Sequence, residues 1–375
     1  MQKTHRQIHS LVREDGRLIV SLQEVPVPEP GPGEVLVRIE AAPINPSDLG
    51  LLFGAADMGT ARFSGSAESP VIEAEIGEAG MRLMAGRLGQ SLAVGNEGAG
   101  TVVAAGEAPE AQALLGRVVG LFGGDMFGEY RCVPAAMCLP LREGFTAEQG
   151  ASCFVNPMTA LGMTETLRME GHEALVHTAA ASNLGQMLNR ICRADGIDLV
   201  NIVRREEQES LLRDLGARYV VNSASERFAE DLQQALAETG ATLAFDATGG
   251  GRLVGQILSA MERVAVSRMD DYSRYGSSVH KQVYIYGALD LSPTILPRNF
   301  GFAWSVGGWL LPNFLARAGA ERVRRMQERV AAELDSTFAS RYQARVGLAE
   351  ALQPQAVGVY GRQATGQKYL IEPQR

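Results

Sequence analysis

Residues 174–194, ALVHTAAASNLGQMLNRICRA, begin as an apolar strand, pass through a turn of small residues and continue as an amphipathic helix. The same strand-then-helix unit recurs three times between residues 198 and 261. Two further strand candidates follow, KQVYIYGAL at residues 281–289 and FAWSV at residues 302–306. Each of the repeated connections holds a helix of about ten residues or more, the length that a crossover between parallel strands requires. The sequence therefore predicts an α/β chain with a six-stranded, doubly wound parallel sheet.

The residues before this sheet have a different pattern. Up to about residue 150 they alternate apolar and polar side chains in short segments, such as RLIVSLQEV at 17–25, between turns rich in Pro and Gly. This pattern predicts a β-rich region. At about 150 residues per domain, the 375 residues indicate two domains. Residues 57–92 form a polar interruption with a short helix expected around residues 79–88. A lid and a solvated insertion without a catalytic role are both compatible with it.

Composition limits the class of ligand. Hydrophobic residues make up 46% and charged residues 21% of the chain, which is typical of a folded globular protein. The net charge of −8 argues against a nucleic-acid or anionic-membrane partner and favours a small-molecule substrate. Four cysteines without a CxxC pair, and an N-terminus without an apolar secretory segment, favour a reducing, cytoplasmic location.

The turn after the strand at residues 174–178 is a candidate phosphate site. Against the pattern G-x-G-x-x-G it reads Ala180-x-Ser182-x-x-Gly185, so only the last glycine is literal. Small residues let the backbone approach a pyrophosphate, and the following helix presents free N–H groups and the positive end of its dipole. An ordinary tight turn between strand and helix is the alternative. The predicted contacts come from the end of the turn and the first residues of the helix: Ala181, Ser182, Asn183, Leu184 and Gly185.

Arg204 and Arg205 lie at the end of the second strand, where an NAD enzyme would carry an acidic residue for the ribose. Guanidinium groups match a 2′-phosphate, so the pair favours NADP(H) over NAD(H). The alternative is a solvated start to a charged helix. Other residues follow the fourth and fifth strands, where open α/β sheets bind ligands, and are expected to line the cofactor groove: Gly249, Tyr286, Gly287 and Ala288.

A set of motifs distributed over almost the whole chain adds up to a family resemblance. They are GEVLVRIEAAPINPSDL, VGNEGAGTVVAAG, FGEYRCVP, FVNPMTALGM, TAAASNLGQ, DLGARYVVN, DATGG and ATGQKYLI. Together they resemble the medium-chain dehydrogenase/reductase superfamily, and within it the zinc-free quinone oxidoreductases and enoyl thioester reductases. The resemblance implies a GroES-like catalytic domain of residues 1–152 and 308–375, and a Rossmann cofactor domain of residues 153–307.

The resemblance also implies roles for particular residues. It puts Asn45 and Asp48 beside the nicotinamide end of the cleft and brings Asn156 and Thr159 close to the nicotinamide. Simple capping explains some of these residues as well: Asn45 as a turn former, Asp48 as the cap of a helical turn, and Asn156 as a helix cap. No metal is expected, because Asn45, Asn96 and Val155 stand where zinc-dependent relatives carry metal ligands.

One departure from the resembling enzymes concerns the proton donor. Their tyrosine beyond the NPSD motif is missing from residues 48–56. Tyr130 or Ser64 is a candidate replacement, although a packing role for Tyr130 is equally compatible with its motif.

The combined prediction is an NADPH-dependent, zinc-free reductase that transfers hydride to a quinone or an activated C=C bond. An enoyl thioester reductase is the alternative substrate class. A non-catalytic NADPH-binding sensor or structural protein is the alternative of another kind. The resemblance also places the apolar segment FAWSVGGW at residues 302–309 near the region that pairs edge to edge in homodimers of the family, so a homodimer is expected.

Overall fold

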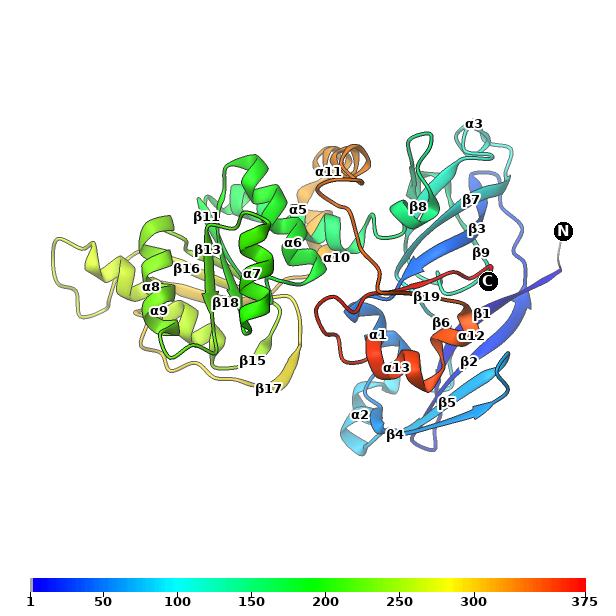
Figure 1. Cartoon of the computed structure of the whole chain (residues 1–375), viewed down its shortest axis with the longest axis horizontal. Coiled ribbons are helices and arrows are strands. Elements are labelled where there is room, and N and C mark those ends of the chain that lie inside the picture. The colour runs from blue at the N-terminus through cyan, green and yellow to red at the C-terminus, as the bar shows by residue number, and fades with distance from the viewer. Residues whose placement is uncertain (1–2) are drawn as a thin grey trace. The chain divides into compact units, whose positions relative to one another are not determined.

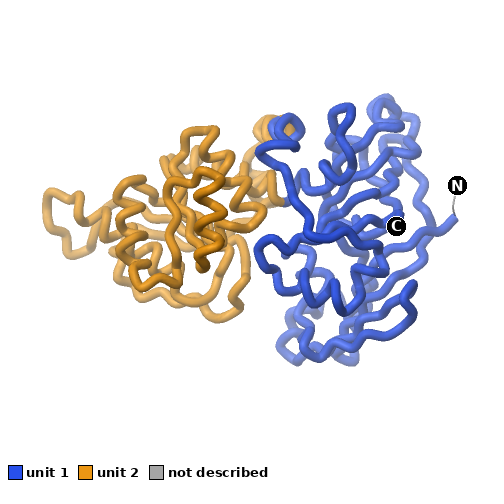
Figure 2. The backbone as a smooth tube through the Cα atoms, viewed as in Figure 1, with its two compact units in different colours: residues 1–155, 329–375 blue, residues 156–328 orange. Residues whose placement is uncertain are grey.

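The computed structural model describes residues 3–375, and its chain forms two compact units (Figure 2). The first unit contains the residues up to 155 together with 329–375, and the second contains residues 156–328. This division differs from the boundaries expected from the sequence, because residues 308–328 belong to the second unit rather than the first.

The second unit is built on a six-stranded sheet in which every neighbouring pair of strands is parallel (Figure 1). This confirms the predicted doubly wound sheet. The strands, in their order across the sheet, are β13 (Tyr219–Asn222), β12 (Asp198–Val203), β11 (Ala174–Thr178), β14 (Leu243–Asp246), β16 (Lys281–Ile285) and β18 (Trp304–Gly308). The short strands β15 (Gly249–Gly251) and β17 (Asp290–Thr294) pair separately.

Helices cover both faces of this sheet. Val200 of β12 packs in an apolar cluster with Leu232 and Ile257. The next residue, Asn201, accepts a hydrogen bond of 3.3 Å from Asn189. Neighbouring residues of a strand point to opposite faces, so α8 and α9 lie on one face and α6 on the other. The helices are α5 (Val155–Glu170), α6 (Asn183–Asp195), α7 (Glu206–Asp214), α8 (Phe228–Thr239), α9 (Leu253–Ser267), α10 (Leu311–Ala318) and α11 (Ala320–Ala332).

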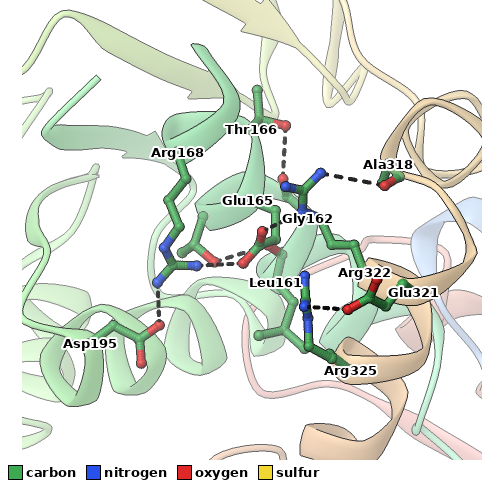
Figure 3. Close-up of polar contacts among 11 residues, drawn as sticks. Leu161, Gly162, Glu165, Thr166, Arg168, Asp195, Ala318, Glu321, Arg322 and Arg325 are labelled. Carbon is green, nitrogen blue, oxygen red and sulfur yellow. Dashed lines mark hydrogen bonds and ion pairs between the residues drawn. The ribbon is translucent and has the colours of Figure 1, made fainter. Parts of the chain in front are cut away.

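Ion pairs join α5 to its neighbouring helices (Figure 3). Arg168 of α5 contacts Asp195 of α6 at 2.8 Å, and Glu165 of α5 contacts Arg322 of α11 at 2.9 Å. Partly exposed pairs of this kind contribute at most about 1 kcal/mol each. Apolar packing therefore sets the position of α5, and the ion pairs add to it. Trp309 also donates a hydrogen bond of 3.1 Å to Thr166 within this helix.

The first unit contains two sheets. Their orders are β4-β5-β2-β1-β6 and β10-β8-β7-β3-β20-β19, with β9 also paired to β3. The strands are β1 (Thr4–Val12), β2 (Arg17–Pro26), β3 (Glu34–Pro43), β4 (Asp57–Gly65), β5 (Pro70–Glu75), β6 (Ser91–Ala93), β7 (Glu97–Ala105), β8 (Val118–Phe122), β9 (Tyr130–Pro134), β10 (Cys138–Pro140), β19 (Ala344–Val346) and β20 (Tyr369–Ile371).

Short helices accompany these strands, and a common core holds the unit together. Ile8, Val37, Val119 and Phe127, from different parts of the first unit, are fully buried in it. The helices are α1 (Pro46–Leu52), α2 (Glu78–Leu83), α3 (Pro109–Gln112), α4 (Ala147–Gly150), α12 (Leu348–Ala351), α13 (Pro354–Tyr360) and the 3-10 turns η1 (Ala85–Arg87) and η2 (Ala135–Met137). None of the helices within residues 3–375 has the length and apolar character needed to cross a membrane.

Residues 57–92 are more regular than the sequence indicated. They form the β4–β5 hairpin, which extends the first sheet through pairing of β5 with β2, and then α2, η1 and β6. In β5 the buried residues Ile72 and Ala74 alternate with Glu73 and Glu75. The polar composition of the segment obscured this alternation, which is the signal that would have predicted a strand. The expected short helix is present as α2 followed by η1.

Candidate functional site

The turn between β11 and α6 is tightly packed. Ser182 is the N-cap of α6, and its hydroxyl accepts a hydrogen bond of 3.1 Å from the Gly185 N–H. A side-chain carbon at Gly185 would overlap the backbone of Ala180, so a glycine is required for the close approach of turn and helix. Ala180 and Ala181 are fully buried. The packing therefore fixes the backbone of the turn against the start of α6.

The start of α6 has the character of an anion site. The helix has 13 residues, and its N-terminus directs backbone N–H groups and the positive end of the dipole past the carboxyl end of β11. Arg204 and Arg205 follow β12, which is paired in parallel with β11. Both side chains are exposed, and neither takes part in an ion pair within residues 3–375. Both predicted phosphate contacts thus lie beyond the same edge of the sheet.

A buried carboxylate that sequence reasoning missed holds the turn after β14 through hydrogen bonds. Asp246, at the end of β14, accepts hydrogen bonds from the Thr178 hydroxyl at 2.6 Å and from the Gly249 N–H at 2.7 Å. Gly249 has a φ of +81°, which favours glycine, and a side chain at Gly287 would overlap the Ala247 carbonyl. The DATGG motif, which begins with Asp246, was the sequence signal that could have identified this carboxylate. Asp246 fixes the backbone on which the predicted groove residues Gly249 and Gly287 lie.

A cavity of about 690 Å³ opens at the carboxyl ends of β16 and β18. This volume is in the range of small-ligand and cofactor sites. Tyr286, Gly287 and Ala288, which were predicted to line the cofactor groove, line this cavity together with Trp309 and Phe314.

His177 lies behind Tyr286 and holds it. The two rings stack with centroids 5.8 Å apart, and a hydrogen bond of 2.7 Å joins His177 Nε2 to the Tyr286 hydroxyl. Burial lowers the pKa of His177 to about 3, so the imidazole is neutral at physiological pH. His177 Nδ1 is buried and has no hydrogen-bond partner among the described residues. The sequence did not single out His177, because nothing in the sequence pairs it with Tyr286, which is 109 residues away.

In the first unit, Asp48 caps the start of α1. Its carboxylate is 1% exposed and accepts hydrogen bonds of 2.7 Å from the backbone N–H groups of Asn45 and Asn96. Burial is the main reason why the pKa of Asp48 is raised to about 7. These hydrogen bonds give Asp48 a capping role, which the sequence offered as the alternative to a catalytic role.

Glu97 is a second buried carboxylate, at the start of β7, and sequence reasoning did not single it out. It is 0% exposed and accepts a hydrogen bond of 2.8 Å from Asn45 Nδ2. Its other oxygen accepts from the N–H groups of Phe154 and Val155 at 2.9 and 2.8 Å. Burial raises the pKa of Glu97. Glu97 therefore caps the start of α5.

Lys368 supplies the positive charge in this region. Its ammonium donates a hydrogen bond of 2.7 Å to the Ser152 hydroxyl, which is 2.9 Å from the Tyr342 hydroxyl. Burial lowers the pKa of Lys368 to about 8, although Glu97 and Asp48 oppose that shift. The lone lysine in the motif ATGQKYLI was the sequence signal for this group. The buried residues Asn45, Asp48 and Glu97, together with the half-buried Lys368, are called here the buried polar cluster of the first unit.

The other candidates lie elsewhere. Tyr130, at the start of β9, packs edge to face against His5 with ring centroids 5.8 Å apart, and no hydrogen bond between described residues joins it to the buried polar cluster. Ser64 is exposed in the β4–β5 hairpin. Asn156 and Thr159 are buried in the first turns of α5. The structure thus brings Asn45 and Asp48 together and leaves Tyr130 apart from them.

The positions that correspond to zinc ligands have other partners. Asn45 Nδ2 donates to Glu97, and the Asn96 side chain donates a hydrogen bond of 3.0 Å to Ser47. Within residues 3–375, no group of three or more His, Cys, Asp or Glu side chains is arranged to hold a metal ion.

Comparison with known proteins begins with a family model. The model described as zinc-binding dehydrogenase matches residues 184–266, all of which belong to the second unit. The positions corresponding to zinc ligands lie outside this match.

Two curated relatives extend the similarity along the chain. The mitochondrial enoyl-acyl-carrier-protein reductase of Caenorhabditis elegans is 29% identical over 274 residues, covering 70% of this chain and 70% of that protein. A mycocerosic acid synthase-like polyketide synthase of Mycobacterium tuberculosis is 28% identical over 249 residues, which are 65% of this chain and 10% of the synthase. This chain therefore spans only a tenth of that synthase.

A solved structure matches the full length. It is the crystal structure of a Mesorhizobium loti protein with the provisional name NADPH:quinone reductase. The two chains are 26% identical with a TM-score of 0.74, and the match covers 100% of this chain and 99% of that chain. The sheet topology, the turn before α6 and these similarities agree. The chain is therefore similar to reductases of the medium-chain dehydrogenase/reductase kind, which its sequence motifs also resemble.

Proposed function

We propose that the protein is a reductase that uses NADPH and acts on a small-molecule acceptor, with the first unit as its catalytic domain and the second as its cofactor domain. One observation carries the proposal. The N-terminus of α6 and the side chains of Arg204 and Arg205 follow neighbouring parallel strands, and neither guanidinium group has an ion-pair partner within residues 3–375. The names of the C. elegans and M. loti relatives, a reductase of enoyl carrier proteins and an NADPH:quinone reductase, also support it.

The residues fit NADPH in three places. The backbone of Ala181 to Gly185 would hold the pyrophosphate, because Gly185 keeps the turn close to the helix. Arg204 and Arg205 would hold the 2′-phosphate, since guanidinium groups match phosphate oxygens. The cavity at Tyr286, Gly287 and Ala288 would take the nicotinamide ring. When bound, NADPH supplies the hydride.

The chain's own residues limit how a proton reaches the product. Asp48 is occupied by two backbone N–H groups, and the stretch from residue 48 to residue 56 contains no tyrosine. The acceptor we infer is therefore a quinone or an activated enone, whose reduced form takes its proton from solvent. Enoyl thioester reduction is the second candidate, favoured by the name of the C. elegans relative and by Ser182 in the turn before α6, a position where the sequence resembles the enoyl thioester reductases.

A third candidate of a different class is a protein that binds NADPH without turnover, as a sensor or a structural partner. The hydrogen bonds that occupy Asn45 and Asp48 in the buried polar cluster favour it. Whether the protein is a reductase or only binds NADPH, Asn156 and Thr159 in the first turns of α5 are proposed contacts of the nicotinamide half of the cofactor. Tyr130 stays a proposed donor only if its contact with His5 is released.

We also propose a homodimer and a cytoplasmic location. β18 is an edge strand of its sheet, and the exposed apolar residue Leu310 lies close to its end. Pairing of two β18 strands would cover the open edge and this side chain. Within residues 3–375 no disulfide joins Cys132, Cys138, Cys153 and Cys192, which fits a reducing compartment.

The test of the proposed function is a turnover assay that follows NADPH consumption in the presence of a benzoquinone, a small enone and a trans-2-enoyl thioester. We expect turnover with the quinone or the enone. Turnover with the thioester alone would establish the second candidate. NADPH binding with none of the three consumed would establish the non-catalytic candidate, and absence of NADPH binding would contradict all three.

A further inference from the structure

A second cavity, of about 640 Å³, lies in the second unit away from the cofactor turns. Two of the segments that line it, within residues 266–276 and 298–302, precede β16 and β18 respectively. They therefore lie at the amino ends of these parallel strands. The turn before α6, Gly249 and Gly287 lie beyond the carboxyl ends. The two cavities consequently belong to opposite edges of the same sheet, and the second is not part of the proposed NADPH site.

A buried ion pair fixes both segments. Lys281, whose side chain is 0% exposed, pairs with Glu262 of α9, and the Ser277 N–H and hydroxyl donate to the same carboxylate at 2.8 and 2.6 Å. Gly276 and Gly301, one from each segment, have positive φ and lie so close to Glu262 that a side-chain carbon would overlap its carboxylate. A buried ion pair is seldom a source of net stability. Its structural effect here is to hold two loops in one arrangement.

The loops and α9 supply three cationic side chains to the cavity: Arg263, Arg274 and Arg298. In the part of the chain that the structure describes, none of the three takes part in an ion pair. Among the residues that line the cavity the one carboxylate is that of Glu262. Lys281 and Ser277 already satisfy it, and their hydrogen bonds lower its pKa despite the opposing effect of burial. An uncompensated positive cavity in a chain of net charge −8 is a feature that attracts anions.

Aromatic rings line the same cavity. Tyr275 and Phe302 meet edge to face with centroids 6.2 Å apart, and they are 57% and 81% exposed. The Arg274 guanidinium lies over the Tyr275 ring, 4.6 Å from its centroid. Arg298 has a φ of +54°, a backbone conformation that costs free energy in a residue other than glycine and that is concentrated at functional sites. The Arg274 guanidinium donates to the Tyr275 hydroxyl, and that of Arg263 donates to Gln233, but neither group has a carboxylate partner within residues 3–375. Exposed rings beside guanidinium groups without carboxylate partners offer stacking and charge-assisted hydrogen bonds to one ligand.

We propose that this cavity binds a planar aromatic anion, a ring carrying a phosphate or a carboxylate group, at a site separate from the cofactor. The ring stacks against Tyr275 and Phe302, and the anionic oxygens accept hydrogen bonds from Arg274 and Arg298. The volume exceeds that of a lone phosphate and is sufficient for a ligand of this kind.

The experiment is a calorimetric titration of the full-length protein with four probes, each in the presence and absence of saturating NADP⁺. The probes are 1-naphthyl phosphate, 1-naphthoate, 1-naphthol and inorganic phosphate. We expect the two naphthyl anions to bind more tightly than either naphthol or phosphate, whether or not NADP⁺ is present. Comparing naphthyl phosphate with naphthoate distinguishes the two sources of the anionic group.

Variants locate the site. Arg274→Gln with Arg298→Gln is expected to weaken naphthyl anion binding about tenfold or more, because charge-assisted hydrogen bonds are lost. Phe302→Ala is expected to weaken the naphthyl anions and leave inorganic phosphate unchanged. Arg218→Gln with Arg227→Gln removes the same charge from exposed positions elsewhere in the unit and is the matched control.

Three outcomes overturn the proposal. The first is that no naphthyl anion binds at millimolar concentration, and the second is that binding survives the Arg274 and Arg298 substitutions. The third is that these substitutions dissociate a dimer while no probe binds, which would mean that a second copy of the chain occupies the cavity. Light scattering run on the same samples reports that case, and the NADP⁺ arm separates a failure of this site from a failure of the proposed cofactor site.

Discussion

Asn45 and Glu97 are 52 residues apart in sequence and are joined by a buried hydrogen bond of 2.8 Å from Asn45 Nδ2 to Glu97 Oε1. The other oxygen of Glu97 holds the first N–H groups of α5. A single carboxylate thus connects the NPSD segment to the start of the helix that leads into the second unit. Lys368 is the cation that balances this carboxylate and that of Asp48.

Glu97→Ala is expected to lower the free energy of unfolding by about 3 kcal/mol or more, because it removes three hydrogen bonds from a buried carboxylate and leaves the half-buried Lys368 without one of its counter-charges. Urea unfolding measures the change. The matched control is Glu40→Ala, which removes a partly exposed carboxylate paired with Arg38 and should cost within about 1 kcal/mol. Equal losses in the two variants would contradict the role given to Glu97.

Asp48→Asn is expected to change how stability depends on pH. The pKa of Asp48 in the folded protein, about 7, lies above the ordinary value of 3.8, so between these pH values the folded state binds more protons than the unfolded state. Ionisation of Asp48 therefore makes the wild-type protein less stable as the pH rises through this window. Unfolding of the Asp48→Asn variant at several pH values should lack this contribution, whereas the exposed Asp15→Asn should retain it.

Gly185→Ala is expected to destabilise the second unit by about 1–3 kcal/mol and to weaken NADPH binding, because the new methyl group overlaps the Ala180 backbone. Gly358→Ala is the control. It lies in α13 with no atom within 4 Å of the new methyl position, and alanine is the better helix former, so stability should rise slightly. Thermal unfolding and NADPH titration of both variants give the comparison. Undiminished NADPH binding in Gly185→Ala would remove the turn from the cofactor site.

Tyr286→Phe is expected to cost about 1–3 kcal/mol, because the buried His177 imidazole then loses its hydrogen-bond partner at Nε2 in addition to lacking one at Nδ1. Tyr284→Phe removes a half-buried hydroxyl that donates to Glu170 at 2.9 Å and should cost less. Urea unfolding ranks the two variants. The reverse order would show that the His177–Tyr286 hydrogen bond contributes little.

Sequence reasoning predicted the parallel sheet because each repeat from β11 to α9 carries its own signal: an apolar strand, a turn and an amphipathic helix. The same local signal located the turn at Ser182 where α6 begins. The β4–β5 hairpin escaped prediction because glutamates on its exposed face made the segment look like a loop.

The buried polar cluster was only half predictable. Asn45 and Asp48 lie in one short motif, so the sequence singled them out. Glu97 and Lys368 belong to the same cluster only because β7 and β20 flank β3 in one sheet. The sequence also left open whether Asp48 is a catalytic group or a cap. That distinction rests on the two N–H groups that the folded backbone brings to its oxygens.

The central claim, that Arg204 and Arg205 select NADPH, is tested most directly by measuring the dissociation constants of NADPH and NADH for the wild type and for Arg204→Gln with Arg205→Gln. We predict that the wild type binds NADPH more tightly, and that the double variant loses about tenfold or more of its NADPH affinity while its NADH affinity stays within about twofold. Equal loss of both affinities, or an unchanged preference for NADPH, would contradict the account.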